Sequence, residues 1–138
     1  MSRINYDISR IRAVAFDVDG VLSPSTVPMA DNGEPQRMVN IKDGYALQLA
    51  VRSGLHIAII SGARTENIRE RYRMLGIEDI YLGASHKLPV LKDWMAAKGL
   101  NPEEVAFVGD DIPDIPPMDF VGLAVAPRDA AADVKAVA

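Results

Sequence analysis

Residues 13–20 read Ala13-Val14-Ala15-Phe16-Asp17-Val18-Asp19-Gly20. Four apolar residues are followed directly by two acids one residue apart. The apolar run is typical of a buried strand, and carboxylates at its end cost free energy unless a partner compensates for their burial. We expect that partner to be a bound cation, in a site that carries out a reaction. Gly20 permits the sharp turn that must follow the acids.

The spacing of the two acids has a chemical interpretation. At the mouth of the strand, Asp17 can point at a substrate as a nucleophile. Asp19 can lie beside it and transfer protons. The alternative is an Asp-Gly turn with no chemistry, so the other polar motifs of the chain must discriminate between the two.

Composition limits the classes of protein to consider. The chain has 138 residues, of which 49% are hydrophobic and 25% charged, and this predicts a single domain over residues 1–138. The net charge of -4 provides no basic field for nucleic acid or a membrane surface. Cysteine is absent, which leaves oxygen atoms and two histidines as metal ligands. We find neither a signal-peptide core nor an apolar run of membrane-spanning length, and therefore expect a cytoplasmic protein.

Strands and helices are predicted to alternate along the chain. Apolar runs predict strands at residues 12–16, 55–60, 79–82, 105–108 and 121–125. Helices are expected at 44–53 with Asp43 as N-cap, at 64–75, at 85–98 with Ser85 as N-cap, and from 129 onward; residues 110–119 are rich in proline and predict one short helical turn. This alternation indicates an α/β fold, a parallel sheet with helices on both faces.

Residues 24–41 interrupt the alternation with three prolines and an Asn-Gly pair. Asn32-Gly33 is a strong signal for a two-residue hairpin turn. We therefore predict a projecting hairpin with arms at residues 25–30 and 36–41.

The other polar motifs follow predicted strands in the same way as Asp17 and Asp19. Ser61-Gly62 follows the second strand, Lys87 begins the helix after the third, and Gly109-Asp110-Asp111 follows the fourth. Ligands of open parallel sheets bind beyond the carboxyl ends of the strands. All the candidate groups therefore fall at one edge of the predicted sheet.

In their order, these motifs resemble those of the haloacid-dehalogenase-type phosphatase superfamily. The matching residues are Asp17-x-Asp19-Gly20, Ser61-Gly62, Lys87 and Gly109-Asp110-Asp111-x-x-Asp114. The resemblance covers nearly the whole chain and implies a Rossmann-like sheet in the order 5-4-1-2-3. Asp17 and Asp110 would then face each other across a gap sized for Mg²⁺.

The same resemblance implies a role for each matching residue. Asp17 would attack phosphorus and form an aspartyl-phosphate, and Asp19 would protonate the leaving alcohol and then activate water. Ser61 and Lys87 would hold the phosphate oxygens. Mg²⁺ would be bound by Asp17, Asp110 and the backbone carbonyl of Asp19. Two further acids would act through metal-bound waters or orient the lysine; these are Asp111 and Asp114.

Members of this superfamily usually carry a cap domain over the site, and this chain has no room for one. Only the hairpin and one helix separate the first two strands. A neighbouring subunit is then the expected wall of the site.

The hairpin and residues 40–44 resemble a narrower family, the 3-deoxy-D-manno-octulosonate 8-phosphate phosphatases. The matching features are Asn32-Gly33-Glu34 at the hairpin tip and the segment Asn40-Ile41-Lys42-Asp43-Gly44. The family resemblance implies a tetramer, a role in lipopolysaccharide precursor synthesis, and substrate contacts from residues 40–44, Gly62 and Arg71. Lys42, Gln48 and Ala63 stand where arginines are common in the bacterial enzymes.

Three alternatives remain open at this point. Related enzymes cleave nine-carbon 2-keto-3-deoxy sugar-acid 9-phosphates, and some carry a glutamate at the place of Ala63, whose absence favours the eight-carbon substrate. A non-catalytic tetramerisation module, like the domains fused to cytidylyltransferases, would be free to lose Asp19, Lys87 or Asp110, and all three are present. A broad housekeeping phosphatase would hydrolyse p-nitrophenyl phosphate and simple sugar phosphates comparably well.

Overall fold

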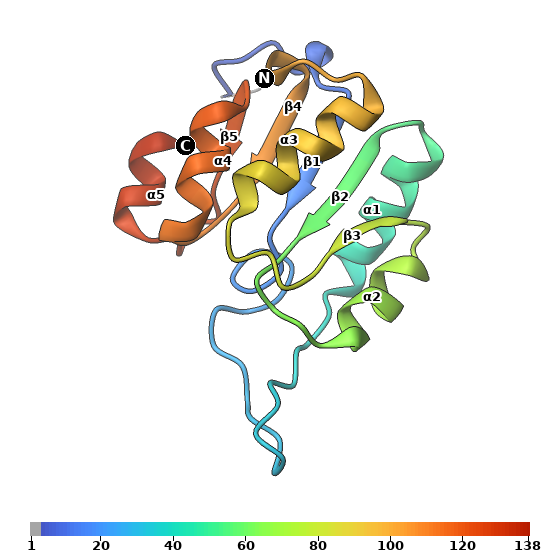
Figure 1. The fold of residues 1–138 in the computed structure, drawn as a ribbon, viewed down its shortest axis with the longest axis vertical. Coiled ribbons are helices and arrows are strands. Elements are labelled where there is room, and N and C mark those ends of the chain that lie inside the picture. The colour runs from blue at the N-terminus through green and yellow to red at the C-terminus, as the bar shows by residue number, and fades with distance from the viewer. Residues whose placement is uncertain (1–3) are drawn as a thin grey trace.

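The computed structural model describes residues 4–138 and is built on a five-stranded parallel sheet (Figure 1). The strands are β1 (Ala13–Phe16), β2 (His56–Ile60), β3 (Asp79–Tyr81), β4 (Val105–Val108) and β5 (Leu123–Val125). Their order across the sheet is β3-β2-β1-β4-β5. This is the predicted order read from the opposite edge, so the α/β fold and its topology are confirmed.

Strand β1 occupies the centre of the sheet and pairs with β2 on one side and β4 on the other. Ala13 is in register with both His56 and Val105. Beyond the last strand residue, the Asp17 N–H donates to the Val108 carbonyl at 3.0 Å. The carboxyl ends of β1 and β4 therefore finish side by side.

Helices cover both faces of the sheet, as the apolar strands require. On one face α1 (Ile41–Arg52) and α2 (Glu66–Arg73) pack over a core that includes Leu47, Ile57, Ile59, Ile68 and Tyr72. On the other face lie α3 (Lys87–Lys98), α4 (Ile115–Phe120) and α5 (Ala132–Val137), over Leu91, Trp94, Phe107, Met118 and Val134. Short 3₁₀ helices are η1 (Ile8–Arg10), η2 (Pro102–Glu104) and η3 (Ile112–Asp114).

Two helices have a different N-cap from the one predicted. The N-cap of α1 is Asn40, not Asp43: its Oδ1 accepts from the N–H groups of Lys42 and Asp43 at 2.9 and 3.1 Å. Asparagine caps helices as well as aspartate does, and Asn40 precedes Asp43 in the chain. The helix therefore begins directly after Asn40, and Asp43 lies within its first turn. Helix α3 likewise begins after His86 rather than Ser85.

The proline-rich stretch after β4 contains more helix than one turn, because η3 continues directly into α4. Its prolines stand in the first turns of these helices, at the N1 or N2 positions and just beyond. Backbone N–H groups have no intrahelical acceptor there, so proline removes no hydrogen bond.

The predicted hairpin projects beyond the sheet edge to which the arrowheads of β1 and β2 point (Figure 1). Its paired part is a single antiparallel bridge between Met29 and Pro35, much shorter than the predicted arms. The turn is also different: Gly33 donates to the Ala30 carbonyl at 2.8 Å and has φ of +83°, which makes a three-residue loop over 31–33. Gln36 donates to the Pro28 carbonyl at 2.8 Å, but Pro28 has no N–H to donate in return, so this proline helps to end the pairing.

Between β1 and β2 the chain contains this hairpin and α1, and between β3 and β4 it contains α3 and η2. In the described part of the chain, neither connection therefore contains a cap domain over the carboxyl edge of the sheet. Within residues 4–138, the helices are all too short or too polar to cross a membrane.

Candidate active site

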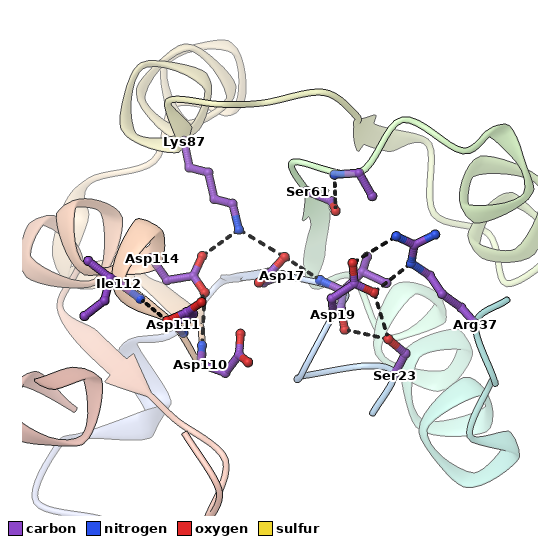
Figure 2. A network of polar contacts seen from close by, with 12 residues as sticks. Asp17, Asp19, Ser23, Arg37, Ser61, Lys87, Asp110, Asp111, Ile112 and Asp114 are labelled. Atoms are coloured by element: carbon purple, nitrogen blue, oxygen red, sulfur yellow. Dashed lines mark hydrogen bonds and ion pairs between the residues drawn. The ribbon is translucent and has the colours of Figure 1, made fainter. Parts of the chain in front are cut away.

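Asp17 lies at the end of β1 and its carboxylate is buried. Its Oδ1 accepts from the Val18 N–H at 2.7 Å and lies 3.0 Å from Lys87 Nζ. Lys87 is the first residue of α3, and only 6% of its side chain is exposed. The ammonium also contacts Asp114 Oδ1 at 2.6 Å, so one lysine joins two carboxylates from different elements (Figure 2).

Asp114 ends η3, where it is almost fully buried. While its Oδ1 binds Lys87, its Oδ2 accepts from the N–H groups of Asp110 and Asp111 at 3.0 and 3.4 Å. The Asp111 carboxylate points elsewhere and accepts from the Ile112 N–H. Asp114 therefore orders the loop after β4 and orients the lysine at the same time.

Three carboxylates converge at this edge of the sheet. Each of them contributes one oxygen to a group of three that all lie within 4.8 Å of one another; the residues are Asp17, Asp110 and Asp114. Asp110 Oδ1 is buried and has no hydrogen-bond partner within residues 4–138. An orphaned buried oxygen beside two other carboxylates fits a hard divalent cation such as Mg²⁺, which prefers oxygen ligands.

Charge and burial oppose each other within this cluster. Burial raises the pKa of Asp17 to about 7, and the neighbouring Asp114 adds to this, while Lys87 pulls the pKa down. Burial and Asp114 also raise the pKa of Asp110 above its ordinary value. Burial alone would lower the pKa of Lys87, but Asp17 and Asp114 outweigh it and raise that pKa. One ammonium thus compensates three carboxylates incompletely, and a bound cation would supply the missing positive charge.

Gly20 is required by the approach of Asp110. Its φ is +83°, a conformation that other residues rarely adopt. A Cβ at this position would lie 1.7 Å from Asp110 Oδ2. The turn after Asp19 therefore leaves room for the acid that comes from β4.

A pocket of about 390 Å³ opens above the cluster. Ser61 lines it from the end of β2, where its Oγ accepts from the Ala63 N–H at 3.1 Å. The walls bring together most of the residues predicted to act on phosphate; they include Asp17, Asp19, Ser61, Gly62, Lys87, Asp110, Asp111 and Asp114.

Asp19 has a partner that sequence reasoning missed. Arg37, on the returning side of the hairpin, donates from Nε to Asp19 Oδ1 at 2.7 Å and from Nη2 to Oδ2 at 2.9 Å. Ser23 Oγ adds a contact to Oδ1 at 3.2 Å. No local spacing signals the arginine, since it lies 18 positions after the acid and reaches it only through the path of the hairpin.

Gly62 lines this pocket, but the other residues predicted to contact the sugar acid are not among its walls. Asn40 and Asp43 line a second hollow, of about 430 Å³, and Arg71 lines a third, of about 180 Å³, together with Arg37. Ile41 and Lys42 are exposed on α1. Gly44 allows the guanidinium of Arg71 to approach the helix, because a Cβ there would lie 2.6 Å from Arg71 Nη2.

Solved structures share this architecture. The 3-deoxy-D-manno-octulosonate 8-phosphate phosphatase from Yersinia pestis superposes with a TM-score of 0.91 at 37% identity, over 95% of this chain and 71% of that one. The enzyme of the same name from Moraxella catarrhalis, in complex with a magnesium ion, a phosphate ion and KDO, has a TM-score of 0.90 at 29% identity, over 95% and 75%. The fold, with its acids at the ends of β1 and β4, is that of the HAD superfamily of hydrolases.

A scan against protein-family models finds no match. Among curated proteins, the 3-deoxy-D-manno-octulosonate 8-phosphate phosphatase KdsC of Escherichia coli (strain K12) is 42% identical over 120 residues. These cover 87% of this chain, which spans about 64% of the length of that relative. The chain belongs to the 3-deoxy-D-manno-octulosonate 8-phosphate phosphatase family, which confirms the predicted resemblance.

Proposed function

We propose that this chain is a Mg²⁺-dependent phosphatase that hydrolyses 3-deoxy-D-manno-octulosonate 8-phosphate, a step in lipopolysaccharide precursor synthesis. The observation that carries the proposal is the contact of Lys87 with both Asp17 and Asp114, beside the unpartnered oxygen of Asp110. A phosphate monoester is an anion, and this arrangement supplies a nucleophile together with positive charge to receive it. The relatives from Escherichia coli and Yersinia pestis are 3-deoxy-D-manno-octulosonate 8-phosphate phosphatases, which supports this choice of substrate.

Asp17 is the nucleophile of the proposed reaction. Its carboxylate oxygen forms a bond to phosphorus while the bond from phosphorus to the sugar oxygen breaks. The leaving oxygen takes a proton from Asp19. Asp19 then removes a proton from water, which attacks the aspartyl-phosphate and releases inorganic phosphate and free Asp17.

Lys87 and Ser61 hold the transferring phosphoryl group. Lys87 Nζ lies 3.0 Å from the attacking carboxylate, so the ammonium is already placed beside the reacting centre. Donors that are fixed before the reaction stabilise developing charge without reorganising. Asp114 holds the ammonium through a second ion pair. Asp111 is the N-cap of η3, the short helix that contains Asp114.

Asp17, Asp110 and the backbone carbonyl of Asp19 are the proposed ligands of Mg²⁺. When bound, Mg²⁺ neutralises charge between the carboxylates and the phosphate oxygens. The carboxylate cluster and the orphaned Asp110 oxygen support this choice, as does the magnesium ion in the relative from Moraxella catarrhalis.

Recognition of the sugar acid is assigned to Gly62, Arg71 and residues 40–44, with a neighbouring subunit completing the wall. The proposal includes a cytoplasmic homotetramer assembled through the hairpins. Exposed apolar side chains on and beside the hairpin support this, since Met29 is 75% and Ile41 79% exposed. Sedimentation equilibrium measures the mass of the assembly in solution. A protein that is monomeric by this measurement and fully active in the phosphate-release assay would contradict the tetramer.

The proposed function is tested by phosphate release from a substrate panel, with and without Mg²⁺. We expect the eight-carbon 8-phosphate to exceed the nine-carbon 9-phosphate and p-nitrophenyl phosphate in kcat/KM by at least about 10-fold. A faster nine-carbon substrate would reassign the sugar, and equal rates on p-nitrophenyl phosphate would indicate a broad phosphatase. No release from any substrate by folded tetramer would indicate a non-catalytic module.

We expect Mg²⁺ affinity to weaken as the pH falls below about 7. Burial raises the pKa of Asp17 to about 7 and also raises the pKa of Asp110, so protons compete with the cation for these oxygens. If one proton is displaced, the apparent Kd should increase about tenfold for each pH unit below that pKa. Titration calorimetry between about pH 5.5 and pH 8 measures this, and a Kd independent of pH would contradict it.

The same raised pKa predicts the sign of the stability change without Mg²⁺. A raised native pKa of Asp17 contributes stability that is complete below the unfolded value, and this stability is lost as the pH rises through about 7. Lowering the pH from about 8 to about 6 should therefore raise the thermal midpoint of the metal-free protein. A large excess of Mg²⁺ at each pH should remove or reverse the trend.

A further inference from the structure

Arg37 lies between the hairpin and the sheet edge and is well buried. Its side chain is 9% exposed, against 42% for Asp19, so the arginine is covered although it comes from a projecting segment. Nε and Nη2 bind the two different oxygens of Asp19, which is the two-point fork that a guanidinium forms with a carboxylate. The hydrogen bond to Asp19 raises the pKa of Arg37 further, so the arginine is positively charged throughout the working pH range. A weaker contact of 3.4 Å joins Nη1 to Thr65, before α2.

The fork leaves the two oxygens of Asp19 unequal. A carboxylate oxygen offers about two acceptor positions. Oδ1 uses both, for Arg37 Nε and the Ser23 hydroxyl, while Oδ2 uses one, for Arg37 Nη2. Asp19 also lines the pocket that contains Asp17 and Ser61. Among the described contacts, Oδ2 thus keeps an acceptor position that Oδ1 does not.

We propose that Arg37 is a positioning residue for Asp19, whose two-point fork leaves Oδ2 as the oxygen that exchanges protons with the leaving alcohol and the hydrolytic water. The inference rests on the proposed function, in which Asp19 is the general acid and base. Its physical reason is geometric: a carboxylate on a short side chain can rotate, and the planar fork removes that freedom. Through Arg37 the hairpin takes part in the chemistry as well as in the proposed assembly.

Two other roles for Arg37 make different predictions. An arginine that binds the carboxylate of the sugar acid would change KM and leave kcat nearly unaltered. An arginine that only anchors the hairpin would change the thermal midpoint, and its effect on turnover would not depend on the leaving group. A positioning role for Asp19 should lower kcat and should disappear when Asp19 is absent.

The experiment compares Arg37→Gln and Arg37→Lys with Arg69→Gln as the matched control. Arg69 is also a hydrogen-bonded arginine near the sheet, bound to Glu66 at 3.1 Å and to the Ile80 carbonyl at 2.8 Å. General acid–base catalysis contributes typically about 10²–10⁴-fold, so Arg37→Gln should lower kcat on the 8-phosphate by about 10–100-fold with little change in KM. Arg37→Lys should recover part of the loss, because lysine retains the charge but not the fork. Arg69→Gln should leave kcat unchanged.

A double-mutant cycle with Asp19→Ala separates this inference from the proposed function. If Arg37 acts through Asp19, Arg37→Gln should have no further effect on kcat in the Asp19→Ala background. Multiplying effects, or a raised KM with unchanged kcat, would overturn the positioning role. Full activity of Asp19→Ala alone would instead show that the proposed acid–base role is wrong.

p-Nitrophenyl phosphate provides a second readout, because p-nitrophenolate leaves without needing a proton. In Arg37→Gln, the first release of p-nitrophenolate should stay fast, while hydrolysis of the aspartyl-phosphate, which needs Asp19 as base, should slow. The result is a burst equal to the enzyme concentration, followed by a slow steady state. Equal slowing of both phases would overturn the inference. If Arg37→Gln fails to fold, Arg37→Lys carries the same test.

Discussion

Asp17→Asn is expected to lower Mg²⁺-dependent phosphate release by about 10⁴-fold or more, the order seen when an enzyme loses its nucleophile. The amide keeps the shape of the side chain but cannot attack phosphorus. It also removes one of the three converging carboxylates, so Mg²⁺ should bind more weakly. Phosphate release from the 8-phosphate at saturating substrate and Mg²⁺ measures the loss.

The fold should survive this substitution. Asp17 is a buried acid with a raised pKa, and Lys87 keeps its contact with Asp114 when the charge at 17 is removed. The thermal midpoint without Mg²⁺ should therefore be no lower than that of the native protein at about pH 8. Asp93→Asn, which changes an exposed acid on α3, is the matched control and should retain full turnover. Turnover by Asp17→Asn near the native rate would exclude Asp17 as the nucleophile.

Lys87→Met is expected to destabilise the metal-free protein by about 3–5 kcal/mol at pH 8, because it leaves two buried carboxylates without their shared cation. Loss of a preorganised donor to the phosphate should also lower kcat by about 10²–10³-fold. Methionine is similar in length and removes the charge with little change in volume. Urea unfolding and steady-state kinetics measure the two effects.

The loss of stability should depend on pH. Below the raised pKa of Asp17, about 7, the protonated acid no longer needs the ammonium, so Lys87→Met should cost less at pH 5 than at pH 8. Lys98→Met on the same helix removes a partly exposed pair with Asp79 at 3.2 Å, and should cost no more than about 1 kcal/mol. Equal losses for the two lysines would show that the buried pairs of Lys87 stabilise the protein no more than a partly exposed ion pair does.

The sheet could be predicted because its signals are local. Apolar runs mark β1, β2 and β4 within a residue of their observed bounds, and the alternation with helices implies a parallel sheet. The rule that ligands bind beyond the carboxyl ends of strands then places Asp17, Ser61 and Asp110 at one edge. The strand order itself came from the family resemblance, and the structure confirms it.

The hairpin and the helix starts were harder to predict, because several residues offered the same local signal. Asn40 and Asp43 are both good N-caps, and the choice depends on where the preceding chain delivers the first turn. Asn32-Gly33 allows more than one kind of tight turn, and the observed one makes a three-residue loop with Gly33 at positive φ.

From the residue order we could predict which kinds of groups meet at the sheet edge: carboxylates, a lysine and a serine hydroxyl, each following a strand. Which of them pair is visible only in the folded chain. Lys87 and Asp114 lie 27 positions apart, and Arg37 and Asp19 lie 18 apart. Strand position follows from short-range periodicity, whereas these pairs depend on the paths of loops and on the space left by Gly20. No local spacing encodes those paths, because they are set by packing against the rest of the fold.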